Sequence, residues 1–135
     1  KTLLLSDMTQ EDIDFLNQSH HFDCAIEAHW STGANGASLH YLPKDSALKP
    51  VFGGSSVLDH NAAAVMPGLS LNELPGATVY ARSVSINNGE IKTGVDLEIV
   101  PFGAGKIVFN QFSVFEGLET NVLADSLFTA IVKLL

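Results

Sequence analysis

The sequence is poor in cysteine and in basic residues. A single cysteine, Cys24, stands among 135 residues, so it forms no internal disulfide and no paired-cysteine metal site, and it does not reveal the redox compartment. Seven Lys and Arg residues stand against 15 Asp and Glu residues, which gives a formal net charge of −8. Because an acidic chain without a basic cluster repels phosphate, we expect neither nucleic acid nor an anionic membrane surface as a partner.

Long apolar runs are also missing. None approaches the roughly 20 residues of a membrane span, and the run at 2–5 is too short for a secretory signal, so a soluble chain is expected. With 46% hydrophobic residues, residues 1–135 suffice for a single domain. Because the chain begins with Lys1 and enters a strand-like run at once, we interpret it as a processed product or a domain excised from a larger polypeptide.

The first thirty residues have the order strand, helix, strand. Residues 2–6 form a short apolar run. Thr9, with Asp12 three positions later, predicts a capped helix that ends near residue 19, and 22–28 predicts a second short strand. A βαβ unit of this kind favours a parallel pair of the two strands.

A loop-rich middle separates this unit from the strands that follow. Residues 31–76 are rich in glycine, proline and serine but too apolar for a solvated tether, so we expect them to be packed. Beyond them we predict a strand over 78–86, a turn over 87–89 and a hairpin over 95–112. The segment 95–99 alternates apolar and acidic residues and predicts a half-buried strand.

A glycine-rich tetrapeptide, Gly103-Ala104-Gly105-Lys106, resembles a phosphate-binding loop. A Walker-type loop needs more residues between its glycines, a Ser or Thr after the lysine, and a following helix. Here a β-branched and aromatic run follows instead, so the tetrapeptide is predicted to be the turn of the hairpin.

The last segment predicts an amphipathic helix. Thr120 or Asn121 would cap it, and the helix would run to the last residue. Asp125, Thr129 and Lys133 fall four apart on one narrow polar stripe, so the remaining faces must pack on the sheet.

Histidine and acidic residues cluster near the end of the first helix. His20, His21, Asp23 and His29 lie within ten positions but have none of the recognised metal-ligand spacings. We expect neither a metal site nor a cofactor, since dipole and solvent already explain histidines at a helix end.

The residue types of a hydrolytic triad occur in the middle of the chain. Ser55, Ser56, Asp59 and His60 lie close in sequence, but the second glycine and the helix of a nucleophile elbow are missing. We interpret them as a turn with solvated hydroxyl groups.

The other catalytic residue types are scattered. Cys24 stands in an apolar context without an exposing glycine turn and is interpreted as buried. Glu27, Glu73, Glu98 and Glu116 offer no local pair for glycoside hydrolysis and are interpreted as surface charge.

One positional argument gives a candidate ligand site. Ligands of a parallel sheet bind beyond the carboxyl ends of its strands, and those ends would carry Asp7 after the first strand and His29 and Trp30 after the second. Trp30 would stack on the apolar face of a sugar, with Asp7 or His29 bonding its hydroxyl groups. The alternative is that Trp30 packs over the sheet edge and Asp7 caps a turn.

The last 80 or so residues resemble a known domain family. The features are the Gly-x-Gly-Lys turn at 103–106, a strand ending in Asn110-Gln111, the connection Glu116-Gly117-Leu118 and a final Ala-Asp-x-Leu helix at 124–127. They resemble the C-terminal part of flavodoxin-like, class I glutamine-amidotransferase-like domains of bacterial glycoside hydrolases of the β-galactosidase or family two type.

The resemblance implies a fold and an absence of chemistry. It implies a three-layer α/β flavodoxin-like (amidotransferase-like) sheet with a C-terminal antiparallel hairpin and a closing helix. True amidotransferases carry a cysteine at a glycine-flanked elbow and a later His-x-Glu pair. Cys24 has no such flanks, so amidotransferase chemistry and a catalytic residue set are not expected.

Three functions follow from these expectations. The first is a non-catalytic accessory domain of a carbohydrate-active enzyme, serving packing, oligomerisation or positioning, with the other domains of the parent chain as partners. The second is a module that binds a sugar or another small ligand, and the third is a hydrolase with an unrecognised active site. A homo-oligomer is compatible with each, and the resemblance favours a periplasmic or extracellular location.

Overall fold

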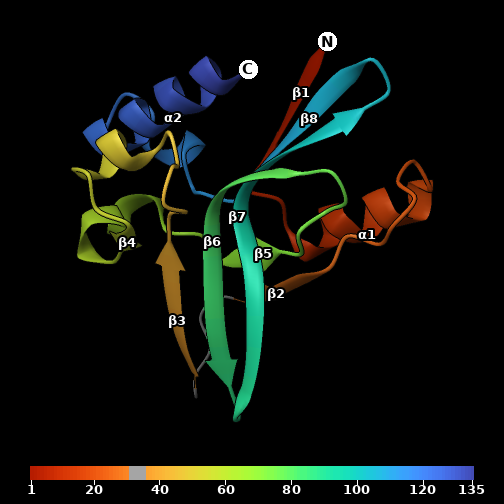
Figure 1. Ribbon diagram of the computed structural model, residues 1–135, viewed down its shortest axis with the longest axis horizontal. Coiled ribbons are helices and arrows are strands. Elements are labelled where there is room, and N and C mark those ends of the chain that lie inside the picture. The colour runs from red at the N-terminus through yellow and green to blue at the C-terminus, as the bar shows by residue number, and fades with distance from the viewer. Residues whose placement is uncertain (31–35) are drawn as a thin grey trace.

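A mixed β-sheet carries two α-helices in this computed structural model (Figure 1), which describes residues 1–30 and 36–135, the side chains of residues 30, 36 and 37 excepted. Over the described residues the sheet has eight strands. The strands are β1 (Thr2–Ser6), β2 (Ala28–Trp30), β3 (Gly36–Tyr41), β4 (Val57–Leu58), β5 (Leu69–Leu71), β6 (Thr78–Asn87), β7 (Glu90–Phe102) and β8 (Gly105–Asn110). The helices are α1 (Gln10–Ser19) and α2 (Val122–Leu134), with short 3-10 turns η1 (Lys49–Phe52), η2 (His60–Val65) and η3 (Phe115–Gly117).

The strand pairing corrects the predicted βαβ unit. The main path of the sheet is β1-β8-β7-β6-β3-β4, and β5 joins β7 to β2. β1 pairs in parallel with β8, whereas β2 pairs antiparallel with β5. The first two strands are therefore not a parallel pair, and the predicted strand over 22–28 is reduced to β2. The reason is that β8, from the far end of the chain, takes the place beside β1.

Helix α1 begins as its local sequence predicts. The Thr9 hydroxyl accepts from the Asp12 N–H at 3.3 Å, and the Asp12 carboxylate accepts from the Thr9 N–H at 2.8 Å, which forms a capping box. The Thr9 N–H lowers the pKa of Asp12, and so does the Thr9 hydroxyl, which donates to the same carboxylate oxygen at 2.9 Å. The helix closes at His20, whose φ of 55° lies in the left-handed region.

Both predicted hairpin turns are confirmed. Asn88 and Gly89 have φ angles of 51° and 79° and connect β6 to β7 in the twist that two-residue hairpins favour. Gly103 has a φ of 56° and lies in the turn between β7 and β8. The glycine-rich tetrapeptide is thus a strand connection.

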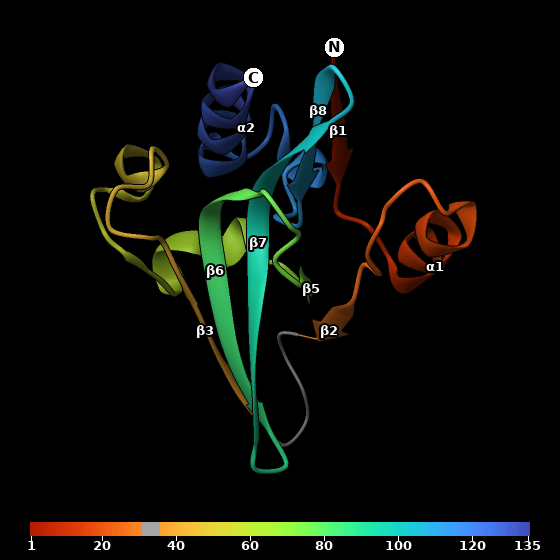
Figure 2. The same ribbon diagram turned by 45° about the vertical axis from the view of Figure 1, so that its right-hand side comes forward.

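Two hydrophobic clusters occupy opposite faces of β8. Val108 belongs to the larger cluster with Leu127 and Ile131 of α2, while Ile107 and Phe109 belong to a second cluster below α1. Because side chains alternate across a strand, one strand serves both. Figure 2 shows α1 and α2 on opposite sides of the β1 and β8 pair.

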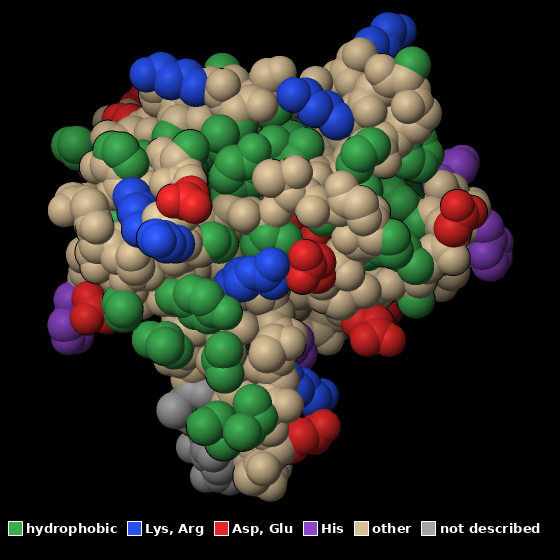
Figure 3. Space-filling view, viewed as in Figure 1, with side chains coloured by type: hydrophobic (Ala, Val, Ile, Leu, Met, Phe, Trp, Pro, Cys, Tyr) green, Lys and Arg blue, Asp and Glu red, His purple; other side chains and the backbone are tan. Residues whose placement is uncertain are grey.

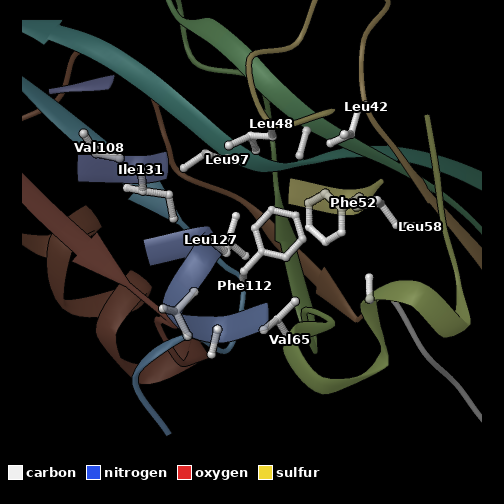
Figure 4. Close-up of a cluster of buried hydrophobic side chains, with 14 of the residues drawn as sticks. Leu42, Leu48, Phe52, Leu58, Val65, Leu97, Val108, Phe112, Leu127 and Ile131 are labelled. Carbon is white, nitrogen blue, oxygen red and sulfur yellow. The ribbon is translucent and has the colours of Figure 1, made fainter. Parts of the chain in front are cut away.

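The larger cluster confirms that most of the middle segment is packed. Phe52 lies beside Phe112, with ring centroids 6.2 Å apart, and Leu42 and Leu48 face the same cluster (Figure 4). Residues 31–35 of that segment lie outside the described part of the chain. The predicted closing helix is also confirmed, since the Asn121 side chain caps α2 by accepting from two of its N–H groups.

The predicted half-buried strand over 95–99 is wrong in one respect. Asp96 and Glu98 were expected on its solvent side, but they are 1% and 0% exposed. β7 runs through the centre of the sheet, with β6 and β8 on its edges and β5 also paired to it. Acidic and apolar residues of this strand therefore point to opposite faces of the sheet, and both faces are covered.

The surface carries dispersed charge. On the face shown in Figure 3 the Lys and Arg side chains are spread out rather than gathered in one patch. Within the described residues, neither helix is long and apolar enough to cross a lipid bilayer.

Candidate functional site

A buried polar network lies at the centre of the sheet, around Asp96. One carboxylate oxygen lies 2.6 Å from Nδ1 of His40, and the other accepts from the Ser70 hydroxyl at 2.6 Å. The Ser83 hydroxyl donates to Ser70 Oγ at 2.8 Å. All four side chains are almost fully buried. Both carboxylate oxygens therefore have a hydrogen-bond partner, as a buried carboxyl group requires.

The position of Asp96 follows from an irregularity in the β6–β7 ladder. Ala81 pairs with Leu97 and Arg82 pairs with Val95, so Asp96 has no partner residue of its own. An extra residue of this kind forms a bulge, which redirects its side chain and increases local twist. Here the bulge accompanies the contacts of Asp96 with His40 on β3 and Ser70 on β5.

Gly94 lets a second histidine approach the network. A Cβ built on Gly94 would lie 2.7 Å from Cε1 of His29, and equally close to atoms of Ser70 and Ser83. Any side chain at this position would displace these neighbours. Because Gly94 has no side chain, His29 of β2 and Ser70 of β5 can approach β7 closely at this point. His29 thereby lies at the edge of the network.

Three buried polar atoms near this point have no hydrogen-bond partner within the described part of the chain. They are Nε2 of His29, Nε2 of His40 and Oγ of Ser85. Burial and the nearby Lys92 charge both lower the pKa of His29, so its neutral form is favoured. In the neutral tautomer that carries its proton on Nδ1, His40 would donate to Asp96 and present Nε2 as an acceptor.

Burial limits the access of a substrate to His40 and Asp96. A carboxylate that orients an imidazole is the base arrangement of hydrolytic sites. His40 is only 2% exposed, however, and its Nε2 contacts no hydroxyl group that could act as nucleophile within the described residues. The arrangement links β3, β5, β6 and β7 through buried side-chain hydrogen bonds.

A small polar pocket opens beside His29. It has a volume of about 290 Å³, and Glu27, Lys92 and Thr93 contribute to its wall. Asn72 also lines it, and the Asn72 side chain accepts from the Glu27 N–H at 2.9 Å and donates to the Ala25 carbonyl at 3.1 Å. The pocket thus combines a fixed backbone with a carboxylate and an ammonium group, which suits a small polar ligand.

The structure separates the residues of the predicted ligand site. Asp7 follows β1, and its carboxylate accepts from the Ser113 hydroxyl at 3.4 Å. His29 and Trp30 lie in β2, and β8, β7 and β5 intervene between β2 and β1. The positional argument for one shared crevice therefore fails, because it required a parallel pair. His29 keeps a pocket of its own, and the Trp30 side chain lies outside the described part.

The residues of the proposed triad, Cys24 and Lys106 each have a structural explanation. Ser55 Oγ donates to the Val57 carbonyl at 2.9 Å, and Asp59 caps η2, as expected of a turn. Cys24 is partly exposed rather than buried and lines a pocket of about 290 Å³ with His21 and Phe102. Lys106 donates to the Leu134 carbonyl at 3.4 Å.

Glu98 is a second buried carboxyl group that sequence reasoning placed at the surface. Its Oε2 accepts from the Leu74 N–H at 3.2 Å, and its Oε1 has no partner among the described residues. Burial raises the pKa of Glu98 to about 7. The nearby pair of Glu73 and Arg82, 3.0 Å apart, is exposed by comparison.

Sequence reasoning missed the network because its members come from four strands. Ser83 and Ser85 occupy alternate positions in β6, and a pair of small hydroxyl residues on one strand face was the only local signal. His40 and Asp96 are 56 positions apart, and their contact depends on strand order and on the bulge. No local pattern encodes either.

Among the described residues, no group of three or more His, Cys, Asp or Glu side chains is arranged to hold a metal ion. Comparison of the chain with models of protein families, with curated proteins and with solved structures gave no match.

Proposed function

We propose that this chain is a non-catalytic accessory domain of a carbohydrate-active enzyme, a glycoside hydrolase by resemblance, and that it serves packing, oligomerisation or positioning of the catalytic part. The observation that carries the proposal is the open edge of the sheet at β1. Within the described residues β1 pairs only with β8. A strand edge with free N–H and C=O groups is a template for another chain.

Apolar side chains beside this edge support the proposal. Leu3 and Phe102 are 52% and 42% exposed. With Ile107 they line a groove of about 640 Å³, and Lys1 and Lys106 also contribute to its wall. A large apolar groove beside a strand with one open edge is typical of a surface that another protein segment covers.

The finer fold assignment is also a proposal. A flavodoxin-like, amidotransferase-like architecture of three layers is supported by the parallel β1–β8 pair and by the two clusters on opposite faces of β8. The hairpin of β7 and β8 and the closing helix α2 match the parts of the chain that carry the resemblance.

Two measurements test the accessory role. The isolated chain is expected to hydrolyse neither aryl glycosides nor glutamine nor simple esters. Hydrolysis that disappears in Cys24→Ala, Ser55→Ala or His40→Ala would contradict the proposal, and the same assay tests the alternative of an unrecognised hydrolase. Sequencing the flanking coding region is expected to reveal a glycoside hydrolase catalytic domain in the same reading frame. An unrelated domain there would also count against the proposal.

A second function, binding of a sugar or another small ligand, has one specific observation in its favour. The pocket beside His29 is polar, is fixed by Asn72 and lies on the strand that contains Trp30. A screen of mono- and oligosaccharides by ligand-observed NMR tests it. Binding that is lost in Trp30→Ala and in His29→Ala supports the module. Binding that neither substitution changes places the ligand elsewhere, and no binding favours the accessory role alone.

A further inference from the structure

The open edge of β1 has a chemically symmetric sequence. The segment Lys1-Thr2-Leu3-Leu4-Leu5-Ser6-Asp7 has a base at one end and an acid at the other. A hydroxyl residue lies inside each end, and three leucines occupy the centre. Read backwards, the segment presents the same residue types with the charges exchanged. This is the pattern needed for two copies to lie antiparallel.

Two hydrogen bonds show which backbone groups of β1 are free. The Lys106 N–H donates to the Lys1 carbonyl at 3.0 Å, and the Asp7 N–H donates to the Asn110 carbonyl at 2.7 Å. Since backbone groups alternate in direction along a strand, odd-numbered residues turn theirs toward β8. The residues that turn their N–H and C=O groups toward the open edge are Thr2, Leu4 and Ser6.

The free backbone groups match in one antiparallel register. When Leu4 lies opposite Leu4 of a second copy, Thr2 lies opposite Ser6, and every outward-facing residue of the strand meets another. Each such pair exchanges two N–H···O bonds. Moving the register by two residues leaves an outward residue unpaired at each end. Moving the register by one residue places residues whose backbone groups face the open edge opposite residues whose backbone groups face β8.

The side chains agree with the same register. Leu3 then lies opposite Leu5 of the second copy, on the face of the sheet where Leu5 packs against the cluster below α1. The half-exposed Leu3 thereby gains an apolar neighbour. Lys1 and Asp7 are both exposed and lie just beyond the two ends of β1, and the backbone leaves the strand at Asp7, whose φ is 49°. In this register the Lys1 of each copy lies at the end of the interface that carries the Asp7 of the other, so charges of opposite sign face each other at both ends.

We propose that β1 pairs antiparallel with β1 of a second copy of this chain about a two-fold axis at Leu4, which joins the two sheets into one. The proposal rests on the proposed function, because it names the partner of the open edge. A two-fold contact of this kind closes on itself and leaves no further copy of the edge exposed. The overall charge of −8 on each chain opposes association elsewhere, whereas this edge carries balanced charge.

Sedimentation equilibrium of the chain and of two kinds of variant tests this pairing. The Leu4→Pro substitution removes an N–H group that faces the open edge and that β8 does not use, a position where an edge strand tolerates proline. Loss of two N–H···O bonds across the axis should weaken the dimer by at least about tenfold. Circular dichroism reports whether each variant remains folded.

Charge reversal gives a test that does not depend on proline. Lys1→Asp and Asp7→Lys each place like charges together at both ends of the interface, so each should weaken dimerisation about fivefold, and the double variant should restore it. Lys44→Asp makes the same change at an exposed residue outside β1 and should leave the dissociation constant within about twofold.

The outcomes separate this pairing from the accessory role itself. A monomer at about 1 mM, or a dimer that neither Leu4→Pro nor the single charge reversals weaken, would overturn the pairing. If the chain is monomeric and catalytically inactive, the accessory role still holds, and another protein segment covers the open edge of β1. Catalytic turnover by the isolated chain contradicts the accessory role whether or not the chain dimerises.

Discussion

Asp96 shows how one bulged residue determines which strands meet. Its carboxylate accepts from Ser70 and faces His40 while fully buried. Removing one member of a buried charged network leaves the others unsatisfied, so Asp96→Ala should lower the free energy of unfolding by about 3 to 5 kcal/mol. Urea denaturation followed by circular dichroism measures this loss.

The matched control for this substitution is Asp45→Ala, because Asp45 is exposed. It should change the free energy of unfolding by no more than about 0.5 kcal/mol. Equal urea midpoints for the two variants would mean that the network contributes nothing to stability. Because the magnitude expected for Asp96→Ala is a large part of the roughly 5 to 15 kcal/mol of a typical domain, partial unfolding in buffer agrees with the prediction.

Glu98 should make stability depend on pH near neutrality. Its pKa rises from 4.5 to about 7 on folding, so the folded chain holds the proton more tightly than the unfolded chain does. This stabilisation is complete below about pH 4.5 and is lost as the pH rises through 7. The free energy of unfolding should therefore fall by roughly 2 to 4 kcal/mol from this group between pH 4.5 and pH 8.

The variant Glu98→Gln isolates this contribution. His29 acts with the opposite sign, because its pKa is lowered on folding, and its stabilisation is present above pH 6.5 and lost as the pH falls through the folded pKa. Both chains retain His29, so the difference between their urea stability profiles reports Glu98 alone. Parallel profiles from pH 4.5 to pH 8 would contradict the raised pKa.

At the scale of elements, α2 covers one face of the sheet through its apolar stripe. Leu127 is fully buried beside Phe112 in the larger cluster (Figure 4). Leu127→Ala should reduce the free energy of unfolding by about 2 to 5 kcal/mol, because it removes apolar contacts and leaves a cavity. Val132 is 46% exposed on the same helix, and Val132→Ala should stay within about 0.5 kcal/mol. Thermal melts that match for both would show that α2 is peripheral.

The elements that sequence alone predicted are those with local signals. The capping box at Thr9, the turn at Asn88 and Gly89 and the cap at Asn121 each depend on residues within four positions of one another. The pairing of β1 with β8 joins Leu3 to Ile107, and no local pattern encodes that contact. For the same reason the separation of Asp7 from His29 and the burial of Asp96 could not be predicted, since both depend on strand order.

At the scale of the molecule, the two ends of the described chain meet at one residue. Lys106 bonds to the Lys1 carbonyl through its N–H and to the Leu134 carbonyl through Nζ, and Figure 1 shows both termini at the same end of the fold. A linker of about six Gly and Ser residues, with a root-mean-square span of about 13 Å, should join them without strain. Circular permutation therefore offers a test of the whole topology.

The position of the new ends decides how fast such a permutant folds. Opening the exposed turn at Asn88 and Gly89 turns the β6–β7 hairpin, the pair with the most local contacts, into a contact between distant parts of the chain. Opening the exposed loop at Lys44 and Asp45 leaves that hairpin intact. In both permutants the free energy of unfolding, measured by urea denaturation, should lie within about 1 to 2 kcal/mol of that of the parent chain.

Their refolding rates should differ, because strands that are distant in the chain lose more conformational entropy before their pairing contributes favourable contacts. In stopped-flow refolding, the permutant opened at the β6–β7 turn should be about tenfold or more slower than the one opened at the loop. Equal rates would mean that this hairpin forms after the rate-limiting step of folding.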